Sequence, residues 1–172
     1  MIMLAYIFAY GSLLDKESRE STIKTDLVFP CVLKGNYIRY WTYHPRDHTL
    51  VVLGMSQHTS KGNVNGVLLL VDDSMLSKLD EREYGYTRVE LDKKDLEISK
   101  EMDSDIPLYT YLLHRDRDIE IMNGLMNSRY MYICFRGFLV YGTAYVIQFI
   151  ETTDGWKYPW MEYYVDSYKK IC

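Results

Sequence analysis

Cysteine is scarce in this chain of 172 residues, and no apolar run is long enough to span a membrane. The three cysteines, Cys31, Cys134 and Cys172, are an odd number at wide spacings, so neither a disulfide framework nor a zinc site is expected. We interpret them as reduced thiols of a cytoplasmic protein. The apolar segment Met1–Tyr10 lacks a basic leader, which predicts a buried strand in place of a signal peptide or a membrane anchor.

An excess of positive charge is also lacking. The chain has 20 Lys and Arg against 24 Asp and Glu, a formal net charge of -4 and a pI of about 5.6. Because phosphate backbones are bound by basic patches, no nucleic-acid partner is expected. Internal repeats and low-complexity linkers are missing too. With 48% hydrophobic residues, the sequence predicts a single globular domain over residues 1–172.

Seven short runs of apolar, β-branched or aromatic residues predict strands. They are Met3–Ala9, Leu27–Leu33, Tyr37–Tyr43, Leu50–Leu53, Val64–Val71, Tyr86–Leu91 and Ile106–Leu113. Turns are expected at Lys34–Asn36 and His44–Asp47, which would make a meander of the second to fourth runs. Gln57–Gly62 is expected to be a polar connection, and Asp92–Asp105 an exposed hairpin.

Helical patterns follow or interrupt these runs. Lys16–Thr25 is expected to be a short helix or a loop, and Asp72–Glu83 changes to a helical period after acidic and capping residues. Two more helices are expected, one starting at Asn127 or Ser128 and one over Ala144–Glu151. The prediction is an α+β fold, a mixed and partly closed β-barrel of about six to seven strands with flanking helices.

Two local features carry candidate chemistry. In Phe8–Leu14 a buried strand meets a glycine turn, where successive backbone N–H groups form a concavity for anionic or carbonyl oxygens. In Leu79–Glu83 an acidic cluster ends the predicted helix, although helix C-termini disfavour carboxylates. A half-buried carboxylate has a raised pKa and is a competent general acid or base. Alone, each feature is also typical of an ordinary turn.

Together, the two features resemble the gamma-glutamylcyclotransferase family over most of the chain. Phe8–Leu14 is similar to the Tyr-Gly-Ser substrate loop of that family. Val64–Arg88 resembles its strand, helix and strand around the catalytic glutamate, which falls on Glu83. Asn127–Tyr130, followed by Gly137, Gly142 and Tyr145, is similar to its pair of C-terminal helices.

The resemblance implies an enzyme that cyclises a small gamma-glutamyl peptide or amine to 5-oxoproline, with Glu83 as general acid and base and with no metal or cofactor. Its implied substrate-binding residues are Tyr10, Gly11, Ser12, Leu13 and Tyr111. Tyr109 competes with Tyr111 for the last assignment. Leu13 departs from the family, because glutathione-related enzymes often have Asn at that position.

Several alternatives stay open. A non-enzymatic binding or regulatory protein could use the same scaffold, since fold does not imply function. The aromatic segment Trp156–Tyr168 is able to close the pocket or to pack against a second copy in a homodimer. His44, Asp47 and His48 lie close together in the sequence and could suggest a metal site. Pro45 between them breaks a helical display of ligands and the third ligand is not evident, so a hairpin loop is favoured. A serine hydrolase is rejected because Ser12 lacks the Gly-x-Ser-x-Gly elbow.

Overall fold

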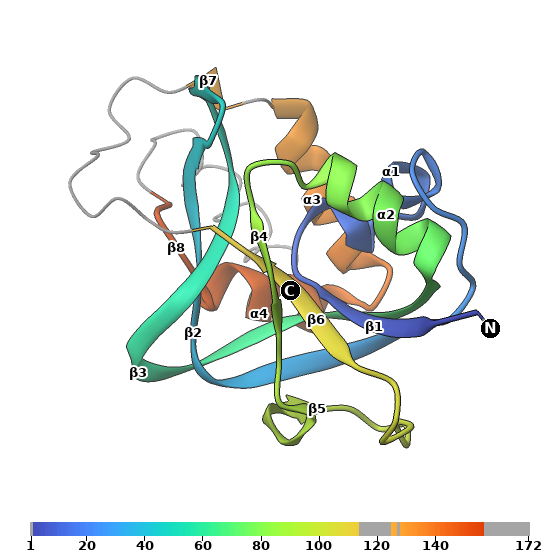
Figure 1. Ribbon diagram of the computed structural model, residues 1–172. Coiled ribbons are helices and arrows are strands. Elements are labelled where there is room, and N and C mark those ends of the chain that lie inside the picture. The colour runs from blue at the N-terminus through green and yellow to red at the C-terminus, as the bar shows by residue number, and fades with distance from the viewer. Residues whose placement is uncertain (1, 114–124, 127, 157–172) are drawn as a thin grey trace.

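The computed structural model describes residues 2–113, 125–126 and 128–156, and within them one mixed sheet curls around the core (Figure 1). Its path is β4-β6-β1-β3-β2-β5, and the short strands β7 and β8 pair off this path with β3 and β2. The strands are β1 Leu4–Ala9, β2 Val28–His44, β3 Asp47–Asp72, β4 Thr87–Glu90, β5 Leu96–Glu97, β6 Leu108–Leu112, β7 Leu125–Met126 and β8 Thr153–Asp154. The predicted α+β fold with a partly closed barrel is confirmed.

The strands β2 and β3 form one long antiparallel hairpin, so the predicted meander was wrong. Lys34–Asn36 is not a turn: Gly35 has a φ of 116° and lies at a shift of the β2–β3 register between Gly35 and Tyr37. Such a bulge bends a strand without ending it. Gln57–Gly62 likewise belongs to β3 and is not a connection.

The segment Asp92–Asp105 also differs from the prediction, because it is not a hairpin of its own. It contains the 3-10 turn η2 Lys93–Asp95 and the strand β5, which pairs antiparallel with β2 at Val32 and Leu33. Leu96 is buried, so the segment joins the main sheet through an apolar anchor.

The helical elements are the 3-10 turn η1 Ser12–Leu14 and the helices α1 Lys16–Glu20, α2 Asp73–Arg82, α3 Ser128–Leu139 and α4 Thr143–Glu151. The helices α2, α3 and α4 lie where the sequence predicts them, Lys16–Thr25 contains a short helix, and the expected glycine turn continues as a 3-10 turn. Asp72 caps α2 by accepting a hydrogen bond from the Met75 amide. Helix α3 contacts both η1 and α4. No helix among the described residues is long and apolar enough to cross a bilayer.

The strand β1 lies at the centre of the sheet and positions the loop that follows it. It pairs antiparallel with β3 and parallel with β6. Its residues Ala5–Ala9 are all buried, as expected for a strand covered on both faces. Since β6 runs beside β1, Tyr111 is brought next to the chain leaving β1 at Tyr10.

Candidate active site

The loop that leaves β1 presents backbone N–H groups that no described residue accepts. Gly11 precedes η1, whose bonds run from the Leu14 amide to the Gly11 carbonyl and from the Asp15 amide to the Ser12 carbonyl. The first N–H groups of a helical turn have no partner within it. The amides of Gly11, Ser12 and Leu13 therefore stay available, within the described part of the chain, to an oxygen atom brought by a ligand.

Gly11 lies where the loop passes β3 and α3, and a Cβ at this position would fit at van der Waals contact. A Cβ at this position would lie 3.4 Å from Leu53 Cδ1 and 3.5 Å from the Tyr130 hydroxyl. A side chain here would fill the room between the loop, β3 and α3.

Glu83 lies directly after the last residue of α2, and its amide donates to the Leu79 carbonyl at 2.8 Å. The following turn reverses the chain at Gly85, whose φ of 103° favours glycine. The Glu83 side chain is 18% exposed, and within the described residues its carboxylate accepts no hydrogen bond; the nearest cation is Arg82, with Nε 3.6 Å from Oε1. Burial raises the pKa of Glu83, and the charge of Arg82 lowers it in part.

Arg82 joins α2 to the loop. Its guanidinium donates to the Ser12 hydroxyl at 3.1 Å, to the Ser18 carbonyl at 2.6 Å and to the Thr22 hydroxyl at 2.9 Å. The Ser12 hydroxyl is thus an acceptor for Arg82. This residue holds the loop and the Glu83 end of α2 in one arrangement.

The two tyrosines expected in the site contribute rings, because their hydroxyl groups are bound elsewhere. Tyr10 donates to the Tyr111 carbonyl at 2.6 Å, and Tyr111 donates to Asp80 Oδ1 at 2.8 Å. Burial raises the pKa of both hydroxyl groups, so both are neutral donors. Tyr109 lies apart from this cavity, with its ring 5.2 Å from the guanidinium carbon of Arg88.

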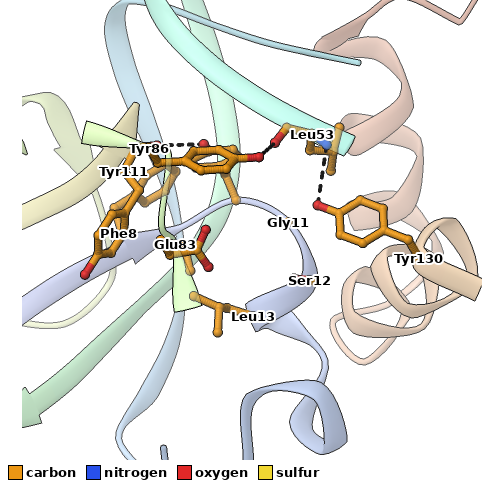
Figure 2. Close-up of a pocket in the computed structure, with 11 residues that line it drawn as sticks. Phe8, Gly11, Ser12, Leu13, Leu53, Glu83, Tyr86, Tyr111 and Tyr130 are labelled. Atoms are coloured by element: carbon orange, nitrogen blue, oxygen red, sulfur yellow. Dashed lines mark hydrogen bonds between the residues drawn. The ribbon is translucent and has the colours of Figure 1, made fainter. Parts of the chain in front are cut away.

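One cavity of about 370 Å³, including its open mouth, brings these residues together (Figure 2). Its lining includes every residue predicted for the site, namely Tyr10, Gly11, Ser12, Leu13, Glu83 and Tyr111. The Glu83 carboxylate is directed between the Tyr86 ring and the Gly11–Leu13 loop in Figure 2. An acceptor of protons therefore faces a row of N–H donors across a small, largely apolar space.

Sequence reasoning missed the aromatic wall of this cavity and the arginines that hold the loop, namely Arg19, Arg39 and Arg82. Tyr86 donates to the Leu53 carbonyl at 2.8 Å, and Tyr130 accepts from the Leu53 amide at 3.4 Å. Both tyrosines belong to segments that carry the family resemblance, and this resemblance was the sequence signal that could have identified them as part of the site. Arg39 donates to the Tyr10 carbonyl at 3.1 Å from inside a predicted strand, where no local pattern marks it.

The remaining candidates add no chemistry to this cavity. The Nδ1 atom of His44 accepts from the Arg46 amide at 3.2 Å, and no group of three metal-binding side chains occurs in the described part of the chain. Cys31 and Cys134 are free, buried thiols. Cys172, Asn127 and the expected aromatic tail after Trp156 lie outside the described residues.

A family model confirms the sequence resemblance. Residues 7–130 match the gamma-glutamyl cyclotransferase, AIG2-like family. The chain belongs to this family. The match includes the loop after β1, Glu83 and the first residues of α3. No curated protein matches the sequence.

Solved structures share the fold at low sequence identity. An uncharacterized human protein is 17% identical, with a TM-score of 0.60, over 95% of this chain and 98% of its own. A gamma-glutamyl cyclotransferase is 16% identical, with a TM-score of 0.60, over 95% and 99% of the two chains. A yeast gamma-glutamyl cyclotransferase specific to glutathione is 11% identical, with a TM-score of 0.51, over 98% and 96%.

Proposed function

We propose that this protein cyclises a small gamma-glutamyl peptide or amine to 5-oxoproline and releases the amine. The observation that carries the proposal is the pairing of Glu83, a carboxylate without a hydrogen bond from the described residues, with the open amides of Gly11–Leu13 in one cavity. Membership in the cyclotransferase family supports the same chemistry.

In this proposal the Glu83 carboxylate takes a proton from the alpha-ammonium group of the substrate. The free amine then attacks the gamma-carbonyl carbon, and the carbonyl oxygen becomes an oxyanion that accepts from the loop amides. Glu83 returns its proton to the departing nitrogen, and the gamma-carbon to nitrogen bond breaks. The attacking nitrogen loses two protons over the cycle and the departing nitrogen gains two, so charge is balanced.

The cavity is suited to a reaction within one molecule. Holding the amine against its own gamma-carbonyl removes much of the entropy of activation, provided that the glutamyl chain is folded back on itself. The rings of Tyr86 and Tyr111 and the side chain of Leu13 bound the cavity and limit the volume available to an extended chain. The raised pKa of Glu83 favours transfer in both directions.

The test is to incubate the protein with a panel of gamma-glutamyl dipeptides, glutathione and gamma-glutamylamines, and to measure 5-oxoproline. Glu83→Gln is expected to lower kcat at least about 100-fold, the usual contribution of a general acid and base. Glu81→Gln is the matched control, since Glu81 is an exposed carboxylate of the same helix. Equal turnover by wild type and Glu83→Gln would remove Glu83 from the mechanism.

A further inference from the structure

Arg39 is a buried cation without a carboxylate partner among the described residues. It lies in β2 and has 0% exposure. Burial lowers the pKa of its guanidinium to about 9, so the group is still charged at neutral pH. An uncompensated buried charge is strongly destabilising, and neutral acceptors must therefore surround this one.

The acceptors come from three separate parts of the chain. The rings of Phe138 and Phe149 also lie close, at 5.1 and 4.6 Å from the guanidinium carbon. Nε donates to Thr153 Oγ1 at 2.7 Å. Nη2 donates to Asn65 Oδ1 at 2.8 Å, to Thr152 Oγ1 at 2.9 Å and to the Phe149 carbonyl at 3.3 Å. Nη1 donates to the Asn65 carbonyl at 2.7 Å and to the Tyr10 carbonyl at 3.1 Å.

The bond to Tyr10 reaches the candidate site through a single peptide group. The Tyr10 carbonyl and the Gly11 N–H belong to the same planar, conjugated unit. A charged donor on the oxygen draws electron density from the nitrogen, and hydrogen bonds in such a chain strengthen one another. The Gly11 amide, which no described residue accepts, is therefore made a better donor toward the cavity.

We propose that Arg39 is a positioning residue for the reaction, which fixes the Tyr10–Gly11 peptide and strengthens the Gly11 N–H as a donor to the gamma-carbonyl oxygen of the substrate. This inference rests on the proposed cyclotransferase function. It predicts an effect on kcat that a purely structural arginine would not produce, because the donor acts most strongly on the oxyanion.

The experiment measures kcat and KM of Arg39→Gln, Arg39→Lys and Thr153→Val, each corrected for the folded fraction at the assay temperature. Arg39→Gln is expected to lower kcat about 10-fold and to keep KM within about threefold of wild type. This kcat loss is smaller than the loss expected when a whole oxyanion donor is removed. Arg39→Lys keeps the charge and is expected to recover part of kcat. Thr153→Val removes the Nε partner but leaves the Nη1 bond to the Tyr10 carbonyl, and is expected to lower stability with a smaller loss of kcat than Arg39→Gln.

The inference is overturned if Arg39→Gln keeps the kcat of wild type, or if its kcat loss equals that of Thr153→Val. An active wild type with an inactive Glu83→Gln would then leave the proposed function intact, whereas a wild type that forms no 5-oxoproline would reject that function itself. If neither Arg39 variant folds, a crystal structure of the wild type with an uncleaved gamma-glutamyl analogue tests the inference instead. A ligand oxygen bonded to the Gly11 amide, with Arg39 still bonded to the Tyr10 carbonyl, supports the inference, and any other arrangement rejects it.

Discussion

The Glu83 carboxylate reduces the stability of the folded protein, because it is largely buried without a hydrogen bond from the described residues. A raised pKa means that the folded state binds the Glu83 proton more tightly than the unfolded state, so ionisation destabilises the fold as pH rises through that pKa. Glu83→Gln should therefore raise Tm at pH 7.5 by roughly 2 °C. Calorimetry at about pH 4, where the carboxyl is increasingly protonated in both states, should show a smaller gain. A less stable variant at pH 7.5 would refute this account of Glu83.

Arg82 holds the pKa of Glu83 below the value that burial alone would give. Its removal in Arg82→Met should raise that pKa. The acidic limb of the kcat/KM profile should therefore shift to higher pH. Arg82→Lys keeps the charge but not the fork that binds Ser12 and Ser18, and should change KM more than the position of the acidic limb. An acidic limb of Arg82→Met at the wild-type pH would contradict the electrostatic role.

The Tyr111 hydroxyl is bound to Asp80, which also pairs with Arg88 at 2.6 Å. Because the ring and not the hydroxyl bounds the cavity, Tyr111→Phe should keep kcat within about threefold of wild type, as expected when no transition-state donor is lost. Steady-state kinetics on the best gamma-glutamyl substrate measure this. A loss of 100-fold would mean that the hydroxyl turns toward the substrate during the reaction.

Among the elements, α3 packs tightly against the end of the loop at Gly137. A Cβ at Gly137 would lie 2.6 Å from the Asp15 amide nitrogen and 2.9 Å from the Leu14 carbonyl carbon. Gly137→Ala should push α3 away from η1 and reduce the free energy of unfolding by about 1–3 kcal/mol, the usual effect of overpacking. Chemical denaturation measures the change. Leu139→Ala, at a position 44% exposed on the same helix, is the control and should change stability little.

The elements that the sequence could predict are those with a local signal. The apolar run before Gly11 and the capped α2 pattern ending at Glu83 depend on neighbouring residues alone, and both are confirmed. The continuity of β2 through Gly35 could not be predicted, since bulge and turn have the same local composition and the partner strand decides between them. The role of Arg39 could not be predicted for a related reason, since its acceptors are up to 114 residues away in the chain.

At the level of the whole molecule, the order of the strands predicts cooperative unfolding. The central strand β1 pairs with β3 and with β6, and β2 receives both β5 and β8, so early and late segments alternate across the sheet. Such interleaving leaves no segment with a core of its own. We expect a single transition in which the calorimetric and van't Hoff enthalpies agree. Two separate transitions would contradict the predicted single domain.

The most direct test of the central claim is a crystal structure of Glu83→Gln with a gamma-glutamyl dipeptide, which this variant should cleave at least about 100-fold more slowly than wild type. The account predicts that the gamma-glutamyl group lies in the cavity between the Gly11–Leu13 loop and residue 83, with a ligand oxygen bonded to the loop amides and the alpha-amine next to the substituted side chain. A gamma-glutamyl group bound elsewhere, or an alpha-amine directed away from residue 83, would contradict the account.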